Sequence, residues 1–597
     1  MALHAWQTVS VPTSDALIET IRSSVIGRDE AVDGPFGPRP VIYADYTASG
    51  RSLSFIEDYL RRAVLPLYAN THTESSGTGL QTTRFREDAR NIIARCVGAN
   101  DEHAVVFAGS GSTGAIAKMV GVLGIRIPST LDDAHHLSDA IPADQRPVVF
   151  IGPFEHHSNE IPWRESIADV VTIAEDADGH VDLEDLAAAL LRYADRPLKI
   201  GSFSAASNVT GIVTDTVAVS SLLHRNGALA FWDYAAAAPY VSISMTAPAS
   251  DSDGYLDAIF ISPHKMIGGP GTPGVLVARK DLFTNRVPVV PGGGTVNFVN
   301  PDEHGYLADI EHREEGGTPA IVESIRAGLV FQLKDAVGIE TIREREEHFV
   351  RRAIERWESN DKIEILGSHD AERLSIVSFV IRYDEGGADT PRTERSYLHH
   401  NFVVAVLNDL FGIQARGGCS CAGPYGHRLL GIDLDRSHEF EREIVNGCEG
   451  IKPGWVRVNF NYFIEDDIAD YILDAVQLVA ERGACLLPHY RFDPSTGLWI
   501  HRDGTPTPPM SLHDIDYISG ALVAVERRLK AETATFASHT AAAVAVLDAL
   551  ECAPPVPLGL PETSADFEHL RWFPYPDEAL SAEPPRAEAR ASSATET

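Results

Sequence analysis

The stretch Ile261-Ser262-Pro263-His264-Lys265-Met266-Ile267-Gly268-Gly269-Pro270 decides the fold of this 597-residue chain. It follows an apolar run, Leu256–Ile261, that predicts a buried β-strand, and it precedes a second such run at Gly274–Ala278. Lysine avoids the ends of buried strands unless a partner or a chemical role keeps it there. Because a serine and a histidine lie within three residues of Lys265, the stretch suggests either a reactive lysine beside a bound phosphate or an ordinary surface turn.

The composition indicates a large chain with a strongly acidic surface. The length exceeds one domain, since about 150 residues per domain is the usual expectation, and 44% hydrophobic residues allow a sizeable core. Asp and Glu total 85 against 50 Lys and Arg, which gives a net charge of −35. Such a surface repels nucleic acids and anionic membranes, so we expect neither as a partner.

The cysteines and the N-terminus indicate a reduced, cytoplasmic setting. Six cysteines are too few for a disulfide framework in a chain of this length. Residues Met1–Gln7 show no basic region followed by an apolar one, so no secretory signal is expected. No stretch of about 18 apolar residues occurs, so no membrane span is expected either.

Apolar runs alternate with helical patterns from Val41 to Asp335, which predicts an α/β fold with a mostly parallel sheet covered by helices on both faces. This large domain would follow an N-terminal segment of residues 1–40. The expected strands are Ala104–Phe107, Val148–Ile151, Leu198–Phe203, Ala228–Trp232, Ala258–Ile261 and Val275–Ala278. The expected helices are Phe85–Val97, Gly114–Leu123, Leu183–Ala194 and Val217–Asn226.

The sequence pattern changes after Gly338, where a long charged helix and a few strand-like runs predict a smaller α+β domain over residues 336–488. Apolar residues then recur at intervals of three and four from Leu512 to Leu529, which predicts an amphipathic helix. The Ala-rich stretch Thr535–Leu550 predicts a second helix. We therefore expect a helical extension over residues 489–576 and a disordered tail over 577–597.

Small and hydroxyl-bearing residues follow the first expected strand, in Phe107–Gly114. They let backbone N–H groups approach a phosphate at the N-terminus of the next helix, and the hydroxyls of Ser112 and Thr113 add donors. A plain Gly/Ser turn explains the stretch equally well. Because the lysine of a nucleotide-binding P-loop is missing, a nucleotide-binding protein is disfavoured.

Polar residues also follow the next three expected strands. His156, after the second strand, could stack on an aromatic cofactor, shuttle protons or lie at the surface. Asn208 follows the third strand. Asp233 ends the fourth, apolar strand, where it either caps backbone or needs a cationic partner such as a protonated pyridine nitrogen. With Lys265, five strand ends carry such groups, and ligands of open α/β sheets bind at this edge.

The chain resembles, over residues 40–475, the class V aminotransferase-fold group of pyridoxal 5′-phosphate enzymes, and within it the cysteine desulfurase/selenocysteine lyase branch. The resemblance implies fold type I and pyridoxal phosphate as the cofactor. The motifs that carry it are Ser110–Thr113, Glu155–Asn159, Ser207–Gly211, Asp233, Ser262–Lys265 and Glu315–Pro319.

This resemblance implies roles for individual residues. Lys265 would hold the cofactor as a Schiff base, His156 would stack on its ring and act in catalysis, and Asp233 would face its pyridine nitrogen. Thr318 would reach the phosphate of the other subunit, which implies a homodimer. The other cofactor-binding residues would be Ser112, Thr113, Asn208, Ser262 and His264.

The most informative part of the resemblance is Arg416–Pro424, which contains Cys419 and Cys421. In desulfurases, an arginine and a catalytic cysteine stand five residues apart on a loop over the active site, and here Arg416 and Cys421 have that spacing. Arg457 would hold the substrate carboxylate, together with Arg416 and Asn208. The Cys-x-Cys form also resembles molybdenum-cofactor sulfurases. A structural or metal pair is the alternative, but no second Cys pair completes a zinc site, so no metal is expected.

The function implied is a cysteine desulfurase that removes sulfur from L-cysteine, leaves alanine and a persulfide on Cys421, and passes the sulfur to an acceptor protein. Ala236 departs from the family, which has a Gln or His there, three residues after the aspartate. Another class V reaction (aminotransferase, lyase or epimerase) therefore stays open. So does a catalytically idle scaffold whose C-terminal helices recruit a partner.

Overall fold

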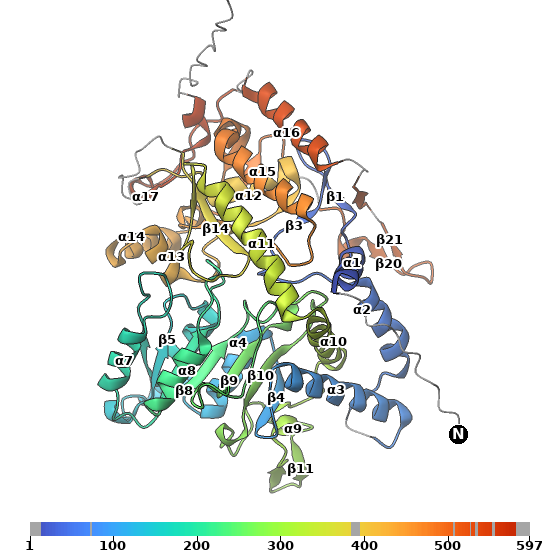
Figure 1. The fold of residues 1–597 in the computed structure, drawn as a ribbon, viewed down its shortest axis with the longest axis vertical. Helices are drawn as coiled ribbons and strands as arrows, with labels where there is room; N and C mark the ends of the chain where they lie inside the picture. Colours follow the sequence, from blue (N-terminus) through green and yellow to red (C-terminus); the bar gives the residue numbers. More distant parts are fainter. Residues whose placement is uncertain are drawn as a thin grey trace, which may run out of the picture.

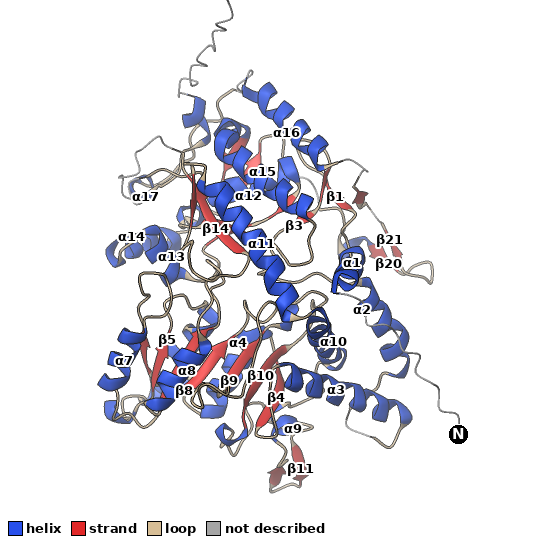
Figure 2. Cartoon of the chain, in the orientation of Figure 1, coloured by secondary structure: helices blue, strands red, loops and turns tan. Residues whose placement is uncertain are grey.

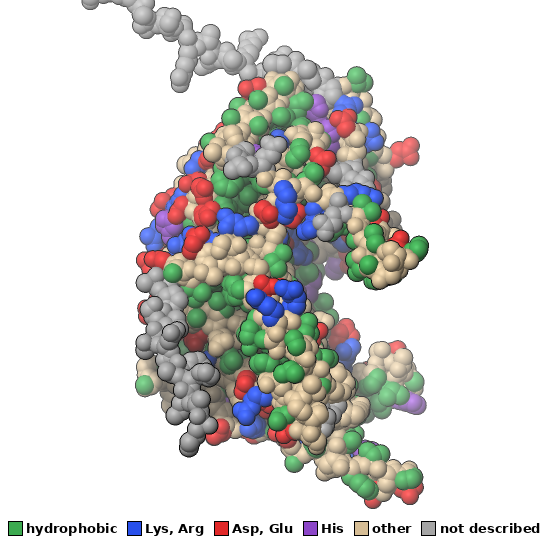
Figure 3. All heavy atoms as spheres, turned by 90° about the vertical axis from the view of Figure 1, so that its right-hand side faces the viewer, with side chains coloured by type: hydrophobic (Ala, Val, Ile, Leu, Met, Phe, Trp, Pro, Cys, Tyr) green, Lys and Arg blue, Asp and Glu red, His purple; other side chains and the backbone are tan. Residues whose placement is uncertain are grey.

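The computed structural model describes residues 14–71, 74–383, 395–504, 508–525, 527–531, 535–551 and 556–580. A seven-stranded sheet forms the lower half of the molecule, and a four-stranded sheet lies above it (Figure 1). A space-filling side view shows a hollow between the upper and lower parts (Figure 3). Within the described ranges, no helix combines the length and the apolar character needed to cross a bilayer.

The large sheet has the mostly parallel topology that the sequence predicts. β10 is antiparallel to both of its neighbours, and all the other neighbouring pairs are parallel. The carboxyl ends of β4, β5, β7, β8 and β9 therefore meet at one edge. In spatial order the strands are β4 (His103–Ala108), β10 (Gly274–Arg279), β9 (Ala258–Ile261), β8 (Leu229–Asp233), β7 (Lys199–Ser204), β5 (Val148–Ile151) and β6 (Asp169–Thr172).

Both faces of this sheet are buried, which explains its continuous apolar runs. Successive side chains of a strand point to opposite faces. In β4, Val106 accordingly packs in one hydrophobic cluster with Ile116 of α4, whereas Val105 and Phe107 belong to the cluster on the other face. Helices lie on both sides of the strands (Figure 2). They include α3 (Gly77–Cys96), α4 (Gly111–Leu123), α7 (Leu183–Arg192), α8 (Thr216–Arg225) and α10 (Ile321–Val337).

Two helices begin earlier than predicted. α4 begins at Gly111, three residues before the expected Gly114. α3 begins at Gly77 rather than Phe85, because the Ser76 hydroxyl accepts a hydrogen bond of 3.1 Å from the Gly79 amide and caps the helix there. The shorter elements of this half are α5 (Ser129–His135), α6 (Ile161–Arg164), α9 (Ile310–Glu314), β11 (Val296–Val299) and β12 (His304–Tyr306).

The smaller sheet is formed by strands from the second half of the chain. Its strands, in spatial order, are β13 (Ile363–Ile365), β14 (Ile376–Ile381), β17 (Trp455–Asn459) and β16 (Arg416–Gly418), all antiparallel. The expected charged helix forms as α11 (Ile339–Glu358). The other helices here are α12 (His400–Phe411), α13 (Gly423–Leu430), α14 (Leu434–Val445) and α15 (Asp466–Arg482). The limits of the domains stay predictions.

The N-terminal region lies against the second half of the chain. Its helix α1 spans Ser14–Ser24, and β3 (Ile42–Tyr43) pairs in parallel with β15 (Ile413–Gln414). The remaining elements of this region are α2 (Ser54–Tyr59), β1 (Glu30–Val32) and β2 (Arg39–Pro40).

The predicted amphipathic helix over residues 512–529 is wrong. The stretch forms a hairpin of β20 (Ile515–Asp516) and β21 (Val523–Ala524), followed by β22 (Leu529–Lys530), which pairs with β1. Gly520 adopts a φ of +79°, in the left-handed region, and this ends any helix between the two strands. The apolar side chains at helical spacing are exposed rather than buried, as Ile518 at 93% shows.

The rest of the extension is only partly helical. The Ala-rich stretch forms α16 (Phe536–Glu551), as expected, and Arg482 of α15 pairs with Asp548 and Glu551 at 2.8 and 2.9 Å. Two strands, β18 (Tyr490–Phe492) and β19 (Trp499–His501), and α17 (Ala565–Leu570) complete it. Residues Pro576–Leu580 form a 3-10 helix, so a disordered tail beginning at 577 is wrong for these residues, and 581–597 lie outside the described ranges.

Candidate active site

A cavity of about 180 Å³ opens at the carboxyl edge of the large sheet. All five strand ends that the sequence singles out contribute to its walls. The lining residues are Ser110, Ser112 and Thr113 after β4, His156 and Ser158 after β5, Ser204, Ala206 and Asn208 after β7, Asp233, Ala235 and Ala236 after β8, and Ser262, His264 and Lys265 after β9.

One end of the cavity is built to receive an anion. The N-terminus of α4 opens there, where unpaired N–H groups and the helix dipole favour negative charge. Hydroxyls gather around it: the Ser262 hydroxyl accepts from the Ser112 amide at 2.8 Å, and Thr113 Oγ1 lies 2.7 Å from the hydroxyl oxygen of Ser158. This set of small donors fits a phosphate group.

Gly111 allows the two loops at this end to meet. Its φ of +55° is in the left-handed region, and a Cβ atom there would lie 2.7 Å from both His264 Cε1 and Ser262 Oγ. Only glycine lets the start of α4 approach the loop after β9 this closely. The glycine is therefore required by contact as well as by backbone conformation.

We expect Gly111→Ala to weaken cofactor binding and to lower the free energy of unfolding by about 1–3 kcal/mol, because the methyl group separates the two loops. Gly124→Ala is the matched control, since Gly124 also has a positive φ (+65°) but no atom within 4 Å of its added Cβ. Thermal unfolding and titration of the apoenzyme with pyridoxal phosphate measure both effects. Equal loss of cofactor affinity in the two variants would contradict this account.

Lys265 and Asp233 are the charged residues in the wall of the same cavity. Desolvation lowers the pKa of the Lys265 ammonium to about 8, although the nearby Asp233 carboxylate opposes this shift. Burial raises the pKa of Asp233, which is 4% exposed, and a hydrogen bond of 2.8 Å from the Ala235 amide acts in the other direction. A buried carboxylate of this kind suits a cationic ring nitrogen.

His156 is held as a neutral ring. Burial lowers its pKa to about 3, and the positive charge of Lys265 acts in the same direction. Its Nδ1 accepts a hydrogen bond of 3.0 Å from the Ser158 amide, so the neutral ring carries its proton on Nε2. Glu155 fixes this loop to β7, because its carboxylate accepts from Asn159 Nδ2 at 2.7 Å and from the Ser204 hydroxyl at 2.6 Å.

Two arginines lie directly opposite each other on neighbouring strands, Arg416 on β16 and Arg457 on β17. Like charges at such positions destabilise a sheet, so this pair calls for negative charge nearby. Arg457 is 3% exposed and donates from Nη1 to the Asn208 carbonyl at 2.9 Å, which brings it beside the cavity wall. Its Nε atom is buried and has no hydrogen-bond partner among the described residues.

The turn that holds Cys421 is strained and contacts the cavity wall. Ser420 and Cys421 have φ values of +51° and +56°, a conformation that side-chain-bearing residues rarely adopt. Asn208 Nδ2 donates to the Ser420 carbonyl at 2.9 Å, and the His157 amide donates to the Cys421 carbonyl at 2.8 Å. No cluster of three or more metal-binding side chains occurs in the part of the chain that the structure describes.

The structure does not bring every predicted residue into the cavity wall. Thr318 is exposed, and its hydroxyl accepts from Asn70 Nδ2 at 3.3 Å. Arg416, Arg457 and Cys421 lie outside the cavity wall itself, although both arginines are close enough to lower the pKa of Lys265.

Sequence reasoning missed Asp45. Its carboxylate pairs with Arg457 Nη2 at 2.8 Å, so it orients the guanidinium and neutralises part of its charge. The signal was available, because Asp45 ends the apolar run after Val41 in the same way that Asp233 ends β8. Its contact with an arginine more than 400 residues later in the chain could not be predicted from the spacing of residues in the sequence.

The comparisons with known proteins agree with this geometry. The profile of the family described as Aminotransferase class-V matches residues 42–436. The chain belongs to this family, which is dependent on pyridoxal 5′-phosphate. The hydroxyl-rich start of α4, the buried Asp233 and Lys265 form a donor set that fits this cofactor.

Curated relatives share one name, and two solved structures share the fold. Proteins named probable cysteine desulfurase from Halalkalibacterium halodurans and Staphylococcus aureus are each 26% identical over 404 residues, 66% of this chain and 86% of the relative. The cysteine desulfurase of Thermococcus onnurineus has 22% identity and a TM-score of 0.58, and CsdA of Escherichia coli has 20% and 0.56. Each of these two likenesses covers 74% of this chain and 95% of the solved one, and both show the fold, fold type I.

Proposed function

We propose that this protein is a cysteine desulfurase, which removes the sulfur of L-cysteine and leaves alanine and a persulfide on Cys421. The observation that carries the proposal is the strained Ser420–Cys421 turn, which is bonded to Asn208 of the cavity wall. Such strain persists only where surrounding structure maintains it, and it concentrates at active sites. The names of the relatives support the same reaction.

The facing arginines would hold the substrate. Arg457, oriented by Asp45, and the exposed Arg416 would bind the amino acid carboxylate, since a guanidinium donates two parallel hydrogen bonds to a carboxylate. The unpartnered Nε atom of Arg457 offers one of these donors. The Asn208 side chain would keep the Cys421 turn above the bound amino acid.

Pyridoxal phosphate, when bound, supplies an electron sink that acidifies the Cα proton of an amino acid. The residues to hold it would be Ser112, Thr113, Ser262 and His264 at the phosphate, His156 at the ring face, Asp233 at the pyridine nitrogen and Lys265 at the aldehyde carbon. With a pKa of about 8, the Lys265 amine can accept the Cα proton near neutral pH and return it.

Sulfur transfer would follow at Cys421. The Cys421 thiolate attacks the substrate sulfur, an S–S bond forms, and the Cβ–S bond of the substrate breaks. The electron pair of the broken Cβ–S bond stays with the carbon skeleton, which takes up a proton to give alanine. The sum is cysteine plus enzyme thiol giving alanine plus enzyme persulfide, and no external oxidant or reductant is needed.

Product analysis tests this function. The holoenzyme is incubated with L-cysteine, selenocysteine and a panel of other amino acids, and alanine, sulfide and keto acids are measured. We expect alanine and protein-bound sulfur in equal amounts from cysteine, and sulfide after a thiol reductant is added. Keto acid formation without alanine, or no product from cysteine, would reject the proposal.

We expect Arg457→Lys to raise the KM for the amino acid about 10- to 100-fold, because an ammonium cannot replace the paired hydrogen bonds of the guanidinium. The substitution keeps the positive charge, and Arg457 lies outside the cofactor cavity, so cofactor content should not change. Steady-state kinetics with parallel measurement of bound pyridoxal phosphate check this. A fall in kcat with unchanged KM would contradict a carboxylate-binding role.

Ala236 favours a second candidate, another class V reaction such as transamination, elimination or epimerisation. It lines the cavity without a side chain that could hydrogen-bond to the cofactor ring. These reactions use Lys265 and do not need Cys421, so the two candidates make different predictions for that residue.

We also propose a homodimer in the cytoplasm with an acceptor protein for the sulfur. The exposed position of Thr318, next to Gly316 and Gly317, supports a role in the partner subunit's site rather than its own.

A further inference from the structure

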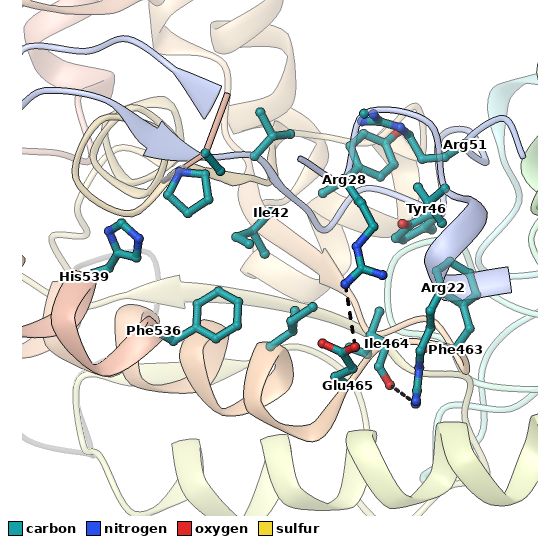
Figure 4. Close-up of a pocket in the computed structure, with 17 residues that line it drawn as sticks. Arg22, Arg28, Ile42, Tyr46, Arg51, Phe463, Ile464, Glu465, Phe536 and His539 are labelled. Carbon is teal, nitrogen blue, oxygen red and sulfur yellow. Dashed lines mark hydrogen bonds and ion pairs between the residues drawn. The ribbon is translucent and has the colours of Figure 1, made fainter. Parts of the chain in front are cut away.

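A second cavity, of about 340 Å³, lies where three distant parts of the chain meet (Figure 4). Arg22 and Arg28 come from the N-terminal region, Ile464 and Glu465 from the loop before α15, and Phe536 from α16. None of the described residues lines both this cavity and the cofactor cavity. Its size lies within the range of about 300–1,000 Å³ that is typical of small-molecule sites.

The walls of this cavity are positively charged, although the chain as a whole carries −35. Among the described residues, three arginines line it, against Glu465 as the one carboxylate. Arg28 pairs loosely with that glutamate, at 3.8 Å. Between the charged groups the walls are apolar, with Ile42, Ile464 and Phe536 facing the space in Figure 4. This combination suits a ligand that has an anionic end and an apolar body.

Arg51 is the group best placed to bind an anion. Its Nη2 donates to the Ile26 carbonyl at 2.8 Å, and its guanidinium lies 5.2 Å from the centre of the Tyr43 ring. No ion pair within 4.0 Å joins it to a carboxylate of the described residues, so its charge is not neutralised within that part of the chain. A guanidinium in this state can donate two hydrogen bonds to a carboxylate.

The local backbone is shaped to hold Arg51 in this position. Gly27 has a φ of +86°, and a Cβ atom there would lie 2.5 Å from Arg51 Nη2. A side chain at position 27 would require the guanidinium to shift. The Ile26 carbonyl and the space left by Gly27 therefore hold the Arg51 guanidinium in one position.

We propose that this cavity is a binding site for a small aliphatic carboxylate, with the carboxylate on Arg51, the charge of Arg28 in the same cavity wall, and the chain against Ile42, Ile464 and Phe536. The site is separate from the cofactor cavity, and the proposal does not depend on which reaction that cavity performs. Arg22 is occupied by the Phe463 and Ile464 carbonyls and supports the wall instead.

The test uses octanoate as the probe and the pyridoxal-phosphate-loaded enzyme, with binding measured by isothermal titration calorimetry. We expect saturable binding of one octanoate per chain that weakens as salt is added, and no comparable binding of octanol, which has the same body without the charge. In Arg51→Gln the dissociation constant should rise at least about tenfold. Arg28→Gln should also weaken binding, and serves if Arg51→Gln does not fold.

Two control variants locate the site. Arg61→Gln removes an exposed arginine that does not line the cavity, and it should leave octanoate binding unchanged. Arg457→Lys tests binding at the substrate arginine of the cofactor site, and it should also leave octanoate binding unchanged. The proposal is overturned by no saturable binding, by equal binding of octanol, or by binding that survives Arg51→Gln and Arg28→Gln but is lost in Arg457→Lys.

Discussion

Lys265→Met is expected to abolish the absorbance band of lysine-bound pyridoxal phosphate at about 410–430 nm. It is also expected to lower turnover of any amino acid by about 10²–10⁴-fold. In the proposed mechanism the Lys265 amine both carries the cofactor and moves the Cα proton, and methionine keeps the volume without the amine. Absorbance spectra of the purified variant after saturation with pyridoxal phosphate and steady-state assays measure the two effects.

Lys334→Met is the matched control for this prediction. Burial lowers the pKa of Lys334 to about 7, much as it lowers that of Lys265, but its amine contacts the Val241 carbonyl and does not line the cofactor cavity. This variant should keep the absorbance band even if it is less stable. A band that persists in Lys265→Met would show that another residue holds the cofactor and would remove the basis of the proposed chemistry.

Cys421→Ala should lower sulfur release from L-cysteine on the order of 10³-fold. The turn beside Asn208 holds no other thiol of the described residues that could replace Cys421. The cofactor spectrum and the perturbation of that spectrum by added cysteine should be preserved, since Cys421 does not line the cofactor cavity. Assays of alanine and sulfide, together with spectral titration, separate binding from sulfur transfer.

Cys419→Ala is the natural control, because Cys419 lies two residues away on the same loop and its carbonyl accepts from the Ala422 amide. The backbone bond does not depend on the side chain, so this variant should retain most activity if Cys419 is a bystander. Unchanged production of alanine in Cys421→Ala would reject the desulfurase mechanism. It would leave the other class V reactions, which need only Lys265.

The parts of the fold that the sequence predicted are those with a strong local signal. β5 and β9 are fully buried runs of four apolar residues and form at the predicted limits. β6 was missed because its residues are only half-buried and lack a continuous apolar run. The cavity at the carboxyl edge was predictable for a related reason, since its polar groups follow buried strands and parallel strands bring those ends together.

What could not be predicted depends on contacts between distant segments. Periodicity alone favoured a helix for residues 512–529, yet pairing of β22 with β1 and the left-handed Gly520 give strands instead. The ion pair between Asp45 and Arg457 and the cavity at Arg51 arise in the same way. Neither has a sequence pattern, because their parts are brought together only by the complete fold.

The pairing of β1 with β22 also has a consequence for how the protein is made. Glu30 and Lys530 meet at 2.7 Å across a separation of 500 residues. At a synthesis rate of about 5–20 residues per second, roughly 25–100 s pass between the appearance of the two on the ribosome. During that interval one edge of β1 has no partner strand, and such an edge invites pairing with other nascent chains. A segment translated 500 residues later therefore closes the sheet that β1 and β2 begin.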